Sequence, residues 1–155
     1  MRPGQDRHEH AERVRSILLP ADTPGLFGLR PGDMLTDARA AIEGLVPDGQ
    51  GGLAATLSLP DPFESRRRLE VNIMPERDRV KIVAVKLFSD DRMDIDGPYK
   101  DLRRALDGIV GKPDREVSGT LTFIYRVPGA IPSDIRITRY KDAQQNNVLD
   151  VTQRP

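Results

Sequence analysis

The chain has 155 residues with 24 basic and 24 acidic side chains, which give a formal net charge of +0. This balance argues against binding to nucleic acid or to an anionic membrane surface, because both favour an excess of basic residues. The absence of cysteine excludes disulfides, thiolate metal sites and cysteine nucleophiles. The length fits one domain or two small halves.

Residues 1–20 are predicted to form an N-terminal tail and a short helix from Asp6 to Leu19, which ends at Pro20. Ala11 and Val14 share one face of that helix at helical spacing. No apolar run reaches the length of a membrane span, and the N-terminus lacks the apolar core of a signal peptide. The sequence therefore predicts a cytoplasmic protein as it stands, or a periplasmic or envelope protein if the chain is a processed or trimmed form.

Residues 25–90 predict a helix followed by three strands. The helix runs from Leu35 to Leu45, with Asp33 or Thr36 as its N-cap. The strands are expected at Leu53–Leu59, Leu69–Ile73 and Val80–Phe88, with a hairpin turn at Glu76–Asp78. Because the strand at 80–88 is the most apolar, we expect it to be central.

Residues 91–152 repeat this order. Leu102 and Leu106 define the apolar face of a helix that Asp96 is expected to cap and that Gly111 is expected to end. Strands are then predicted at 120–126 and 135–140, separated by a loop at 128–132. A turn at 146–147, a last edge strand at 148–151 and a tail at 152–155 complete the prediction.

These patterns predict an α+β fold in which two or three helices pack on one or more antiparallel sheets. The main domain spans 21–155. The repeated order of a helix and a meander is consistent with a tandem duplication whose halves are 25–90 and 91–152, although few residue identities support it.

Two stretches resemble small bacterial envelope domains of the BamE/SmpA type. Residues 28–34, Gly-Leu-Arg-Pro-Gly-Asp-Met, resemble the Gly-x-x-x-Gly-Met-Thr opening of that family, and residues 102–125 resemble its helix, Gly-x-Pro and aromatic strand. The resemblance implies two helices on a small antiparallel sheet and a scaffolding role by protein contact, without catalysis. Tandem copies also resemble β-lactamase-inhibitor-type protein binders. A rival resemblance of residues 28–33 to the carboxylate-binding loop of PDZ domains implies a strand where the sequence predicts a helix.

The acidic stretch at 90–96 is the first candidate binding site. An EF-hand with Gly97 at its sixth position would need carboxylates where Arg92 and Arg103 stand, so that motif is excluded. A looser ligand or divalent-metal site that uses Asp94 and Asp96 is the alternative to a solvated loop.

The second candidate is the run Arg66, Arg67 and Arg68, which has the chemistry to bind phosphate or an acidic partner surface. Glu64 and Glu70 are nearby acids that could neutralise it. His8, Glu9 and Glu12 do not complete a His-Glu-x-x-His zinc motif, and no nucleophile elbow, catalytic triad or phosphate-binding glycine loop is present.

With no catalytic residues identified, the sequence favours a non-enzymatic protein-interaction or scaffolding domain. The expected partner is another protein, and no cofactor, metal or nucleic acid is expected. The alternative is a small-ligand or divalent-metal-binding domain or enzyme that uses the acidic stretch at 90–96.

Overall fold

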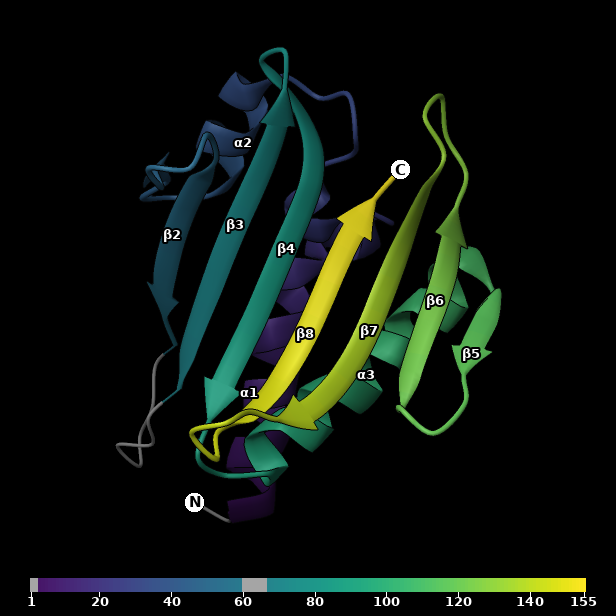
Figure 1. The fold of residues 1–155 in the computed structure, drawn as a ribbon. Coiled ribbons are helices and arrows are strands. Elements are labelled where there is room, and N and C mark those ends of the chain that lie inside the picture. The colour runs from purple at the N-terminus through teal and green to yellow at the C-terminus, as the bar shows by residue number, and fades with distance from the viewer. Residues whose placement is uncertain (1–2, 60–66) are drawn as a thin grey trace.

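The computed structural model describes residues 3–59 and 67–155, with side chains from His8 onward except that of Ser58. Within these residues the fold is α+β, with three α-helices and one antiparallel sheet of eight strands (Figure 1). The helices are α1 (Pro3–Leu18), α2 (Leu35–Ala41) and α3 (Met93–Val110). The strands are β1 (Val46–Pro47), β2 (Leu53–Ser58), β3 (Arg68–Glu76), β4 (Arg79–Ser89), β5 (Arg115–Val117), β6 (Thr122–Val127), β7 (Ser133–Lys141) and β8 (Asn147–Arg154).

The strands are arranged in the order β1-β2-β3-β4-β8-β7-β6-β5. Each half contributes a short strand and a three-strand meander, and the two meanders meet where β4 pairs with β8. As predicted, β4 is central. The prediction for β8 is wrong, because this strand lies between β4 and β7 rather than at an edge and continues to Arg154 through the expected tail.

Helices α1 and α3 cover one face of the sheet, and in Figure 1 they lie behind it. The core fills this interface. Val14 and Leu18 of α1 belong to the same buried cluster as Tyr99, Leu102 and Leu106 of α3. The helix within residues 1–20 therefore shares the core of residues 21–155.

The start of α3 differs from the prediction. The helix begins at Met93, so Asp96 lies in its first turns instead of capping it, and Pro98 is accommodated inside it. The carboxylate of Asp91 accepts the N–H of Met93 at 2.9 Å instead. At the other end Gly111 adopts a φ of 93°, which confirms the predicted stop.

The second predicted helix is shorter than expected, because Ile42 leaves the helical region with φ −125° and ψ 109°. Neither Asp33 nor Thr36 is its N-cap. That position is Met34, whose N–H donates to the carboxylate of Asp37 at 3.1 Å. The hairpin turn between β3 and β4 is as predicted, with positive φ values at Arg77 and Asp78.

Candidate functional site

Asp94, a predicted ligand-binding residue, lies in a buried ion pair. Its side chain is 1% exposed, and Arg67 Nη2 donates to its Oδ1 at 2.9 Å. Ser89 Oγ donates to Oδ2 at 2.8 Å. Both carboxylate oxygens are therefore engaged, and the contacts link the residue before β3 to the end of β4 and the start of α3.

The fold places the side chains of Arg67 and Arg68 in different environments. The side chain of Arg67 is only 7% exposed and is turned inward toward Asp94. Arg68 stacks on the ring of Phe88 at 4.3 Å and pairs through Nε with Glu70 Oε1 at 3.0 Å. Arg66 and Glu64 lie outside the described residues. Of the two nearby acids, Glu70 thus neutralises Arg68.

The carboxylate of Asp96 lies between two arginine side chains. It pairs with Arg139 of β7 and, at 3.3 Å, with Arg92 Nε. Burial of the guanidinium group lowers the pKa of Arg139, and the positive charge of Arg92 lowers it further. The described residues contain no group of three or more His, Cys, Asp or Glu side chains that could hold a metal ion. The carboxylates of Asp94 and Asp96 instead face guanidinium groups.

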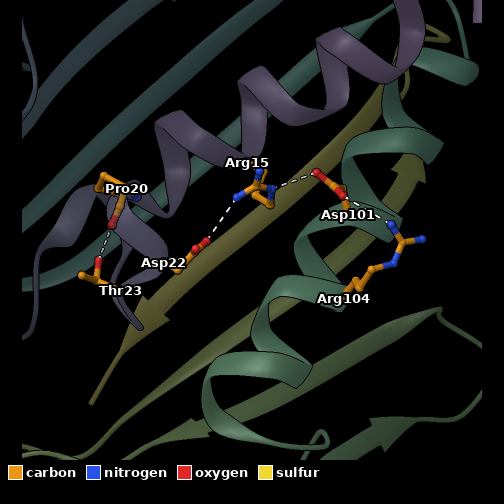
Figure 2. Close-up of polar contacts among 6 residues, drawn as sticks. All are labelled: Arg15, Pro20, Asp22, Thr23, Asp101 and Arg104. Atoms are coloured by element: carbon orange, nitrogen blue, oxygen red, sulfur yellow. Dashed lines mark hydrogen bonds and ion pairs between the residues drawn. The ribbon is translucent and has the colours of Figure 1, made fainter. Parts of the chain in front are cut away.

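A charged groove of about 350 Å³ lies between α1 and α3. Figure 2 shows Arg15 between two carboxylates, with Nη1 3.2 Å from Asp22 Oδ1 and Nε 3.1 Å from Asp101 Oδ2. Arg104 approaches the other oxygen of Asp101 at 3.6 Å. Because the charges compensate one another, we interpret this network as a contact that holds the two helices together.

The other face of the sheet has a different character. No helix among the described residues covers it, and it is the face turned toward the viewer in Figure 1. A hollow of about 300 Å³ lies over β5 to β8. Its lining includes three arginines, two threonines and one isoleucine: Arg115, Arg136, Arg154, Thr138, Thr152 and Ile124. We call this surface the basic hollow.

The strand register brings the three arginines together. Arg115 is opposite Ile124, Ile124 is opposite Arg136, and Arg136 is opposite Thr152. Arg154 lies two residues after Thr152 on the same face of β8. Three adjacent pairings therefore place guanidinium groups from β5, β7 and β8 on one surface.

These arginines are not neutralised by neighbouring acids. Within the described residues, Arg115, Arg136 and Arg154 make no ion pair and no side-chain hydrogen bond. The two acids of the hollow have partners other than these arginines. Asp134 pairs with Arg126 at 3.1 Å, and Asp150 accepts hydrogen bonds from Thr152 at 3.3 Å and from Tyr140 at 3.4 Å. The arrangement can bind an anion, since each guanidinium has donors to spare.

The basic hollow does not follow from the sequence alone. The sequence predicts no strand at 115–117 and a tail at 152–155. The polar face of the strand at 135–140, which carries Arg136 and Thr138, was the one available signal. Its neighbours could be identified only from the order of the strands.

In comparisons with known proteins, no protein-family model, no curated protein and no solved structure matches the chain. In the part of the chain that the structure describes, no helix combines the length and apolar character needed to cross a bilayer.

Proposed function

We propose that this domain is a non-enzymatic protein-interaction module that binds an acidic segment of a partner protein on the open face of its sheet. The observation that carries the proposal is the basic hollow, where Arg115, Arg136 and Arg154 are exposed and pair with no carboxylate of the described residues. The resemblance to BamE/SmpA-like scaffolding domains implies the same kind of role and stays a prediction.

The edges of the sheet offer less for binding than its face. The edge strands β1 and β5 have two and three residues, so a partner strand could form few backbone hydrogen bonds with either. Side-chain contacts on the open face are therefore the better-supported mode of recognition.

The charge pattern favours a protein over a nucleic acid. Asp134 and Asp150 lie within the same hollow as the three arginines. A continuous phosphate backbone would bring negative charge close to both aspartates, whereas separate Asp or Glu side chains can reach the arginines and avoid them. We expect the affinity to fall as salt is added, because these charges are exposed.

The alternative, a metal or small-ligand site at 90–96, has weaker support. The oxygens of Asp94 are held by Arg67 and Ser89, and those of Asp96 by Arg92 and Arg139. A divalent cation would have to displace these groups before it could bind.

The proposal is tested by fluorescence anisotropy with a fluorescein-labelled hexaglutamate peptide at low ionic strength, with hexaglutamine as the uncharged comparison. Arg136→Gln or Arg154→Gln should weaken binding of hexaglutamate about two- to fivefold, since each removes one exposed ion pair. Arg104→Gln is the matched control, because this side chain is 77% exposed and lies on α3.

Two results would contradict the proposal. The first is the absence of hexaglutamate binding, and the second is an equal loss in the Arg104→Gln control. A partner recovered from native cells after mild cross-linking should be captured by the wild-type protein and lost with the Arg136→Gln, Arg154→Gln double variant.

A further inference from the structure

A second hollow lies on the same open face, beside the basic one. Its volume is about 370 Å³, and its floor is largely apolar, formed by Met74, Pro75, Ile82 and Ala84. Met74 is 56% exposed. We call this surface the apolar hollow. A flexible thioether next to a branched side chain can adapt to differently shaped apolar groups.

The wall of the apolar hollow is a firmly held turn at residues 48–52. Asp48 Oδ1 accepts the N–H groups of Gln50 at 2.7 Å and of Gly52 at 3.0 Å. A Cβ atom at Gly52 would come within 2.8 Å of the backbone oxygen of Ile73, so the turn approaches β3 more closely than other residues would permit. The hollow is therefore formed before any partner binds.

The register fixes the spacing of the two hollows. Ala84 of the apolar hollow is opposite Thr152, which is opposite Arg136 of the basic hollow. Two strand spacings of roughly 4.8 Å separate Ala84 from Arg136 by about 10 Å. Two further strands lead through Ile124 to Arg115, another 10 Å or so away.

A partner segment on this face can contact only side chains, because the backbone groups of the strands are paired within the sheet. A helix satisfies its own backbone hydrogen bonds and therefore suits a surface that offers only side chains. Seven residues of helix advance about 10.5 Å and return the side chain to nearly the same face. This advance matches the separation of Ala84 in the apolar hollow from Arg136 in the basic hollow.

We infer that the occupant of the open face is an amphipathic helix of a partner protein, with an apolar residue in the apolar hollow and carboxylates seven and fourteen residues away that reach Arg136 and Arg115. The inference rests on the proposed function and specifies the partner's chemistry. It requires an apolar anchor and an acidic group on one helix face.

Three capped helical peptides of alanine and glutamine test this inference. The matched peptide has Leu at position i and Glu at i+7 and i+14. The shifted peptide has the same composition with Glu at i+5 and i+12, on another face, and the third replaces Leu with Gln. The matched peptide should bind at least tenfold more tightly than either of the others.

Variants of the domain assign the contacts. Met74→Ser and Ile82→Thr should lower the affinity for the matched peptide to that of the Leu-free peptide, while binding of hexaglutamate stays unchanged. Met93→Ser is the matched control, because this methionine is 47% exposed on α3. It should leave the affinity for every peptide unchanged.

The outcomes separate the inference from the function on which it rests. Equal affinity for the matched and shifted peptides, with Arg136→Gln still weakening both, would overturn the helix register and retain acidic-partner binding. Failure of every acidic peptide to bind would remove both. If sedimentation equilibrium shows a dimer that Ile82→Thr dissociates, the occupant is a second copy of this chain and the inference is wrong.

Discussion

Replacing Asp94 with alanine should destabilise the fold far more than a change at a surface binding site would. The substitution leaves Arg67, which is 7% exposed, as a buried charge without its partner. The Nε atom of Arg67 already has no hydrogen-bond partner in the described part of the chain, and Ser89 would lose its acceptor. Removing one member of a buried ion pair costs about 3–5 kcal/mol.

The assay is urea unfolding followed by circular dichroism, which gives the free energy of unfolding by linear extrapolation. For a domain of this size a loss of this magnitude lowers the melting temperature by roughly 6–20 °C. Asp94→Asn keeps the shape and an acceptor for Ser89, so it should cost less than Asp94→Ala. The Arg67→Met, Asp94→Leu double variant should recover much of the stability, because no unpaired charge is left.

The reasoning is refuted if Asp94→Ala lowers the free energy of unfolding by less than about 1 kcal/mol, the range typical of exposed ion pairs. It is also refuted if the double variant is less stable than Asp94→Ala. The first result would mean that the ion pair is solvated in solution, and Asp94 would again be a candidate ligand-binding residue. The second would mean that the cost of Asp94→Ala does not come from an unpaired buried charge.

Leu106→Ala should lower the free energy of unfolding by about 2–5 kcal/mol in the same assay, because the side chain is 1% exposed in the core between α3 and the sheet; wild-type stability would show that the helix faces another way. Burial, reinforced by the hydrogen bond to Asp107, raises the pKa of Tyr125 to about 12. Between about pH 10 and 12 the unfolded state therefore loses the Tyr125 proton while the folded state keeps it, so the free energy of unfolding falls as the pH rises. Urea titrations at several pH values should show that Tyr125→Phe flattens this dependence. Titration with Ca²⁺ or Mg²⁺ should leave the melting temperature unchanged, because guanidinium groups already pair with Asp94 and Asp96; a concentration-dependent rise would favour the metal site.

The sequence predicts what local periodicity determines. The face of α3 with Leu102 and Leu106, its stop at Gly111 and the turn at Arg77 and Asp78 all follow from residue spacing and backbone preference. The α+β class follows from the same signals, since each helix and meander carries its own apolar pattern.

The order of the strands in the sheet cannot be predicted from the periodicity of the sequence. The sequence predicts that Gln153 belongs to a polar tail, yet its side chain is buried against β8's neighbour in the sheet, β7. Its side chain accepts the N–H of Leu26 at 2.8 Å and donates to Ser133 Oγ at 3.2 Å. A polar residue with partners so distant in the chain gives no local sign that it will be buried.

The strand β5 was missed for a related reason. Its three residues, Arg115 to Val117, are all exposed and show no apolar alternation. The candidate site depends on that strand and on β8, so the three arginines remained scattered in the sequence. The sequence indicates Asp94 and Asp96 by their acidity. Arg92, one partner of Asp96, is close in the chain, but Arg67 lies just before β3 and Arg139 lies in β7.

The position of β8 has a consequence for the synthesis of the protein. Its pairing with β4 joins the two meanders, and its register extends through Gln153 and Arg154. During synthesis the first meander can assemble beside α2, but the inner edge of β4 stays unpaired until Asn147–Arg154 has been made. A nascent chain stalled before Asn147 should expose this edge to proteases and chaperones, because the absence of one strand opens the middle of the sheet.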